Sequence, residues 1–196
     1  MDILININEI TTINSIKIIL NNYRQEFVDY KTGEHVKKRQ YRTLSIEEIL
    51  KFNAGICYDV TALEDYIFKL KFPNIWHRCY YTESDGGSYT HAFLLYKDFD
   101  HKYKFIYTKD EAGAWYTYAE SFSLYSVLYK TAKKIYKYND VPFAIFEYTP
   151  PTEIHLTIDD FRKYIFKNGT VMVNKRNYIE NVCIPFINSF SQKFHL

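Results

Sequence analysis

Cys57, His91 and Asp110 are the residues of this chain whose types and order could carry out nucleophilic chemistry. A cysteine nucleophile needs a base to take and return its proton, and the base needs a third group to fix its tautomer. We expect Cys57 on the first turn of a helix, where free backbone N–H groups and the helix dipole stabilise a thiolate. Asp59 opposes this effect, because a nearby carboxylate disfavours ionisation of the thiol. A buried structural cysteine is the other interpretation of the same stretch.

The helices that must position Cys57 are predicted from periodicity and capping signals. After Cys57, apolar residues recur at helical spacing, as Val60, Leu63, Ile67 and Leu70. Phe72-Pro73 closes that segment. Ser45-Ile46-Glu47-Glu48 is a capping box that opens a short helix to about Phe52. Residues 8–28 also carry a helical apolar pattern, so we expect a helix there as well.

The strands that must position His91 follow the cysteine helix. Three strand-like runs, 75–82, 89–97 and 103–108, are joined by short turns and predict an antiparallel meander. His91 lies on the second run, on the face that also holds Tyr89, Phe93 and Leu95. Further along we expect a helix at 119–138, a strand at 143–148, a helix from Thr157 to about Asn168, and then a weak strand with a helical or irregular tail. This order indicates an α+β protein.

Two stretches resemble the transglutaminase-like superfamily, whose members are related to papain-like cysteine proteases. They are Gly55-Ile56-Cys57-Tyr58-Asp59 and Thr90-His91-Ala92-Phe93-Leu94-Leu95-Tyr96, followed by a carboxylate after the next strand. The resemblance covers roughly residues 45–150 and implies N-terminal helices with the cysteine helix packed on an antiparallel sheet. We therefore expect a core domain over 1–150 and a C-terminal extension over 151–196 packed on it. The resemblance makes Cys57 the nucleophile, His91 the base and Asp110 the orienting acid.

The acid is the position at which the chain departs from the family pattern. Family members usually carry it within the strand after an aromatic residue, whereas this strand reads Phe105-Ile106-Tyr107-Thr108. The carboxylates come slightly later, at Asp110 and Glu111. Either could serve, or Thr108 fills the position and the cysteine and histidine act as a pair.

Several other side chains are candidates for a role at the site. Four residues are candidates for the substrate cleft: Trp76, Tyr58, Trp115 and Glu111. His77 is a rival base. His77 and Cys79 could also join Cys57 and His91 in a metal site, but one His-x-Cys lacks the paired close spacing of structural zinc sites. We expect no cofactor, and no acidic loop suggests calcium.

Composition limits the environment and the partners. The chain has 196 residues, of which 47% are hydrophobic and 19% aromatic, and its net charge of +2 is too small to argue for a nucleic-acid partner. Three cysteines, an odd count, fit a reducing compartment. The N-terminus has no signal-peptide pattern and no apolar run is long enough for a membrane span, so we expect a cytoplasmic protein that does not enter membranes. The many Ile, Asn, Lys and Tyr residues suggest an AT-rich bacterial or phage genome.

These observations predict cysteine-dependent acyl transfer or amide hydrolysis on a protein or peptide substrate. A thioester on Cys57 would be resolved by water, as in a protease or amidase, or by an amine, as in a transglutaminase. The alternative is a catalytically silent binding or interaction protein on the same fold, possibly phage-encoded and acting on a host protein. Thr108 in place of an acid within the strand favours that alternative. The sequence does not indicate an oligomeric state.

Overall fold

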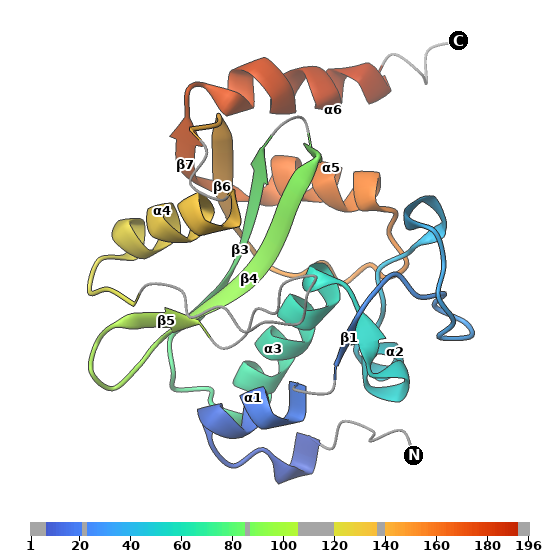
Figure 1. The fold of residues 1–196 in the computed structure, drawn as a ribbon, viewed down its shortest axis with the longest axis vertical. Coiled ribbons are helices and arrows are strands. Elements are labelled where there is room, and N and C mark those ends of the chain that lie inside the picture. The colour runs from blue at the N-terminus through green and yellow to red at the C-terminus, as the bar shows by residue number, and fades with distance from the viewer. Residues whose placement is uncertain (1–6, 21–22, 85–86, 106–119, 137–139, 192–196) are drawn as a thin grey trace.

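The computed structural model describes residues 7–20, 23–84, 87–105, 120–136 and 140–191 (Figure 1). Within them the α-helices are α1 Ile13–Leu20, α2 Ile46–Phe52, α3 Cys57–Lys71, α4 Leu124–Ile135, α5 Ile158–Asn168 and α6 Ile184–Ser191. The strands are β1 Arg24–Gln25, β2 Ala54–Gly55, β3 His77–Ser84, β4 Tyr89–Lys97, β5 Tyr103–Phe105, β6 Phe143–Tyr148 and β7 Thr170–Lys175. No helix of these ranges has the length and apolar character needed to cross a membrane.

The centre of the molecule is a five-stranded sheet with the order β5-β4-β3-β6-β7. Every neighbouring pair in it is antiparallel. The meander expected from the sequence is therefore present as β3–β4–β5, and the protein is a mixed α+β structure, as predicted. A separate parallel pair, β1 with β2, lies beside the start of α3.

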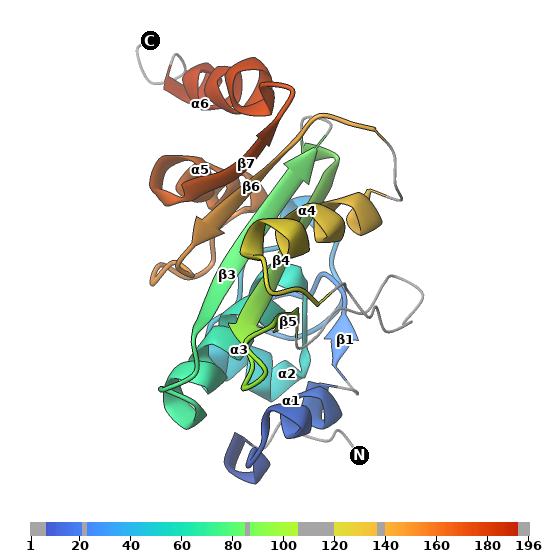
Figure 2. The same ribbon diagram turned by 90° about the vertical axis from the view of Figure 1, so that its left-hand side faces the viewer.

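Helices cover both faces of the sheet (Figure 2). Strand side chains alternate between faces, and the two hydrophobic cores follow that alternation. On one face Ala92 and Leu94 of β4 pack with residues of α3 and α5. On the other face Phe93 and Leu95 pack with residues of α4. The face that a β4 side chain occupies therefore decides which helices it can meet.

Helix α3 begins at Cys57 because the residues before it are fixed by Asp59. The Asp59 carboxylate accepts the backbone N–H of Ile56 at 2.8 Å, which satisfies one donor at the helix start. Gly55 has φ +148°, and a Cβ there would lie 2.6 Å from the Asp59 carboxylate, so this position requires glycine. The helix ends at Lys71, before Phe72-Pro73, as the sequence predicts.

The helix expected over residues 8–28 is wrong in its extent. It runs only from Ile13 to Leu20, and the chain then forms β1. The N–H of Arg24 donates to the Asn53 carbonyl at 3.0 Å, and that of Glu26 donates to the Gly55 carbonyl at 3.0 Å. Pairing with a segment distant in sequence outweighs the local apolar period here. Helix α4 is likewise shorter than the expected 119–138, because Ser123 caps it by accepting the N–H of Ser126.

The C-terminal part of the chain shares the sheet of the N-terminal part. The boundary expected at residue 150 falls between β6 and α5, and beyond it β7 pairs with β6. A five-residue π-helix, Ile179–Cys183, follows and leads into α6. Residues 151–191 are thus continuous with the fold that carries Cys57.

Candidate functional site

Cys57 is the first residue of α3 and its side chain is half-buried. It is a free thiol, as are Cys79 and Cys183. The backbone N–H groups of Ala92, Tyr58 and Cys57 itself point at the sulfur and lower the pKa of the thiol. The contact with Ala92 places the sulfur against the main chain of β4, one residue from His91.

A small cavity has both Cys57 and His91 in its lining. Its lining comes from β1, α3 and β4 and consists of Gln25, Cys57, Val60, Thr61, Glu64, His91 and Ala92. The cavity measures about 10 Å³, which is roughly the space that one water molecule needs. Residues 57 and 91 therefore border the same cavity, with the exposed residue Gln25 at its outer side.

The imidazole of His91 lies on the other face of β4 from Ala92. Its ring is 6.2 Å from that of Phe93, at an interplanar angle of 24°, and Phe93 belongs to the core beneath α4. The Nε2 atom is buried, with no hydrogen-bond partner in the described part of the chain. Among the same residues no hydrogen bond links His91 to Cys57.

Burial keeps the Cys57 thiol and the His91 imidazole neutral. It raises the pKa of the Cys57 thiol to about 12, with a further increase from the Asp59 carboxylate. Burial also lowers the pKa of His91 to about 4. The thiolate-stabilising effect expected at a helix N-terminus is present in the three N–H groups, but desolvation outweighs it.

Glu64 is the cavity residue that sequence reasoning missed. It lies two helical turns after Cys57 on α3, and only 1% of it is exposed. Its Oε1 has no hydrogen-bond partner within the described ranges, and burial raises the pKa of its carboxyl well above the ordinary value. The signal in the sequence was an acidic residue placed directly after Leu63, within the apolar stripe of the helix.

The remaining predicted site residues fall into two groups. Asp110, Glu111 and Trp115 lie outside the described residues. Trp76 and Tyr58 are described, and neither lines the cavity.

The positions of Trp76 and Tyr58 have clear packing reasons. Trp76 packs against the core on the α4 side of the sheet, with its ring 5.2 Å from that of Tyr103. Tyr58 is buried and stacks on Phe161 at 4.3 Å, while its hydroxyl and that of Thr90 are 2.9 Å apart. Tyr58 is a core side chain and Trp76 is a partly buried one that packs on the core, and the substrate-cleft role expected for them stays a prediction.

His77, the rival base, is held at the other end of α3. Its Nδ1 lies 3.0 Å from the Ile75 carbonyl, which that nitrogen can bond only as a donor, and its Nε2 lies 3.4 Å from the Asp65 carboxylate. Asp65 is also paired with Lys69 at 2.5 Å. The described residues contain no group of three or more His, Cys, Asp or Glu side chains placed to hold a metal ion.

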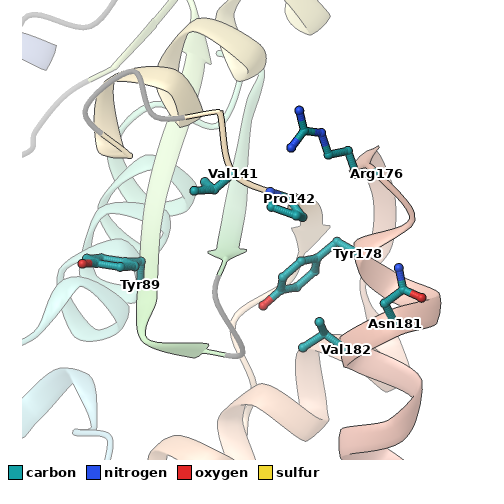
Figure 3. A pocket seen from close by; sticks show the side chains of 7 residues that line it. All are labelled: Tyr89, Val141, Pro142, Arg176, Tyr178, Asn181 and Val182. Carbon is teal, nitrogen blue, oxygen red and sulfur yellow. The ribbon is translucent and has the colours of Figure 1, made fainter.

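A second and larger cavity lies at the end of the sheet where β4 begins and β7 ends. It measures about 330 Å³ and is lined by Tyr89, Val141, Pro142, Arg176, Tyr178, Asn181 and Val182. Figure 3 shows the Tyr178 ring between Pro142 and Val182, with Arg176 and Asn181 on the C-terminal segment. Its walls are mainly apolar, and its size is within the range of small-ligand pockets.

Comparison with known proteins gives no further identification: no family, no curated protein and no solved structure matches the chain significantly.

Proposed function

We propose that the protein carries out cysteine-dependent acyl transfer or amide hydrolysis through Cys57 and His91, on a fold of the transglutaminase-like type. The observation that carries the proposal is the contact between the Cys57 sulfur and the Ala92 N–H, together with the cavity that Cys57 shares with His91. This chemistry needs the base within hydrogen-bond reach of the thiol, so the His91 side chain must turn from the α4 face of β4 toward Cys57 for the reaction. The orienting acid expected at Asp110 or Glu111 stays a prediction.

The reaction follows from the groups at the cavity. His91 takes the thiol proton as the Cys57 sulfur attacks the carbonyl carbon of an amide, and the leaving amine then receives that proton. The resulting thioester is resolved by water or by a second amine, which regenerates the thiol. The carboxamide of Gln25 is the side-chain amide at the cavity and can donate a hydrogen bond to the oxyanion of the tetrahedral intermediate.

Access to the sulfur must increase for this reaction to occur. A cavity of about 10 Å³ admits no peptide, and the buried thiol and imidazole are both neutral at pH 7. Entry of substrate or solvent would restore hydration and favour proton transfer between them. The structure is in this respect a closed state of the proposed enzyme.

The neutral pair also favours a second candidate function. If Cys57 never ionises, the fold is a catalytically silent binding protein and the thiol is a packed side chain. The cavity of about 330 Å³ beside Tyr178 would then be the first surface to test for a ligand.

A peptide library searched for acyl adducts separates the two functions. We expect wild-type protein to form a thioester on Cys57 and to release an amine or a new amide, both detected by mass spectrometry. Cys57→Ala should form neither, and His91→Ala should be at least about a hundredfold slower, as for loss of a general base. His77→Ala is the matched control and should behave as wild type.

Two outcomes would reject the enzymatic proposal. One is turnover by Cys57→Ala equal to that of wild type. The other is the absence of adducts from every peptide, with wild type and Cys57→Ala binding the same partner equally well. The second outcome would establish the binding function instead.

A further inference from the structure

We propose that the larger cavity, beside Tyr178, binds a small organic anion: a carboxylate with an apolar, ring-bearing body. The body would lie against the apolar walls of the cavity, and the carboxylate would accept hydrogen bonds from the exposed side chains of Arg176 and Asn181. This cavity shares no lining residue with the one that Cys57 borders. The inference therefore does not rest on the chemistry proposed for Cys57.

The walls of the cavity account for the apolar body of the ligand. Tyr178 is only 1% exposed, and its hydroxyl donates to Glu83 at 3.0 Å, so its ring and not its polar group is offered to a ligand (Figure 3). Val141 and Val182 are half-buried, and Tyr89 is 61% exposed. Covering these side chains with an apolar ligand removes their surface from water, which is favourable. The cavity of about 330 Å³ has room for a ring system.

The charges beside the cavity favour an anion. Asp140 pairs with both Lys175 and Arg176, so these three side chains carry one net positive charge. Arg176 also donates to the Asp140 carbonyl at 3.1 Å. The two hydrogen bonds to Asp140 use two of the five N–H donors of the guanidinium, which can therefore still donate to a bound carboxylate. The Asn181 carboxamide supplies further donors, and Glu180 beside it in sequence does not line the cavity.

The backbone that carries these side chains has two uncommon features. Arg176 and Asn177 have positive φ angles, 57° and 54°, a conformation that costs free energy in residues other than glycine. The π-helix Ile179–Cys183 follows and brings Asn181 and Val182 to the cavity. Such helices are rare and are frequent at functional sites. The geometry of this segment thus places polar and apolar side chains at one cavity, which supports a role in binding.

Titration with 2-naphthoate and with its uncharged amide, 2-naphthamide, tests the inference on the full chain. We expect the wild type to bind 2-naphthoate saturably, with a Kd of about 1 mM or below. In ¹H–¹⁵N spectra, the largest shifts should be those of Tyr89, Tyr178 and Val182. The amide should bind at least about tenfold more weakly, because it lacks the charge that Arg176 would pair with.

Two arginine variants test the source of this preference. Arg176→Gln should weaken binding of 2-naphthoate at least about tenfold and leave that of 2-naphthamide within about twofold of wild type. Arg78→Gln is the matched control. The Arg78 side chain is 51% exposed, against 55% for Arg176, and it also pairs with one carboxylate, that of Glu147, but it does not line the cavity. This variant should bind both probes as the wild type does.

A third variant tests the place of the apolar body. Val182→Trp puts an indole ring into the cavity and should abolish binding of both probes. Circular dichroism shows whether this variant is folded. The test with Arg176→Gln does not depend on that check, because Arg176 is exposed.

The inference would be overturned if the wild type did not bind 2-naphthoate saturably, or if the shifts were centred away from the cavity. Equal affinities for 2-naphthoate and 2-naphthamide would reject the preference for an anion. Equal weakening by Arg176→Gln and Arg78→Gln would show a general effect of charge and would reject the assignment of Arg176. None of these measurements requires turnover, so a failure here and a failure of the activity proposed for Cys57 are distinguishable.

Discussion

The decisive property at the scale of single residues is the charge of Cys57 and His91. With pKa values of about 12 and about 4, proton transfer from thiol to imidazole inside the closed cavity is unfavourable. At about 1.4 kcal/mol per pKa unit, the penalty is on the order of 10 kcal/mol. Any chemistry at Cys57 therefore depends on access of water to the thiol and the imidazole. Without substrate, the reactivity of Cys57 should be that of a buried, neutral thiol.

The pH dependence of Cys57 alkylation tests whether the thiol is buried and neutral in this way. Because burial raises the pKa of the Cys57 thiol, its reaction with iodoacetamide should rise about tenfold per pH unit up to pH 9 without a plateau. Cys79 and Cys183 are fully buried, so they should react more slowly than the half-buried Cys57 at every pH. Mass spectrometry of the three labelled peptides gives the rates. A plateau below pH 8 would show a lowered thiol pKa and contradict the buried state.

At the scale of elements, the start of α3 is organised by Asp59. Its carboxylate accepts the hydroxyl of Tyr41 and the backbone N–H groups of Leu44, at 2.9 Å, and Ile56, at 2.8 Å. One side chain thus joins the loop before α2 to the first turn that carries Cys57. Burial nevertheless raises its pKa from 3.8 to about 6, although each of the three hydrogen bonds lowers it.

Asp59→Asn should lower the free energy of unfolding, and the difference from wild type should depend on pH. The amide group cannot accept at both positions, so one donor loses its partner, at a cost of about 1–3 kcal/mol. The folded-state pKa of Asp59 is raised, so its favourable contribution is complete below about pH 4 and is lost as pH rises through 6. The difference in unfolding free energy should therefore shrink by roughly 3 kcal/mol from pH 4 to pH 7. Urea unfolding at each pH measures it, and a gap that grows with pH would refute the raised pKa.

The elements with strong local signals could be predicted from the sequence. The Ser45 capping box, the break at Gly55 and the Pro73 stop defined α2 and α3, and regular alternation defined β4. The prediction of one helix over 8–28 failed because β1 depends on pairing with β2, which lies far away in sequence.

The candidate site was only partly predictable for a related reason. Residue types and order indicated Cys57 and His91, but their pKa values depend on burial, which no local pattern reveals. Glu64 was hidden because helical periodicity shows on which face a residue lies, and not what that face meets. Its position becomes visible only in the cavity between α3 and β4.

At the scale of the whole molecule, a buried ion pair links the C-terminal part to the central sheet. The carboxylate of Glu83 on β3 accepts two hydrogen bonds from the guanidinium of Arg162 on α5, of 2.9 and 2.7 Å. The hydroxyl groups of Tyr81 and Tyr178 also donate hydrogen bonds to the Glu83 carboxylate, at 2.5 and 3.0 Å. The guanidinium also stacks on Phe186 of α6, 4.0 Å from the ring centroid. The strand next to β4 is therefore anchored by residues beyond position 150.

Arg162→Met should destabilise the whole fold, since it leaves the Glu83 carboxylate buried with only two tyrosine donors. Removing one member of a buried ion pair costs about 3–5 kcal/mol. Lys163→Met, the adjacent substitution on α5, breaks the half-exposed pair with Asp160 and should cost less than about 1 kcal/mol. Adding Glu83→Gln to Arg162→Met should recover part of the loss, because the buried charge disappears. Urea unfolding followed by fluorescence measures each variant. Similar stabilities for Arg162→Met and Lys163→Met would mean that the C-terminal part does not depend on this pair, and that packing of β7 on β6 alone holds it to the sheet.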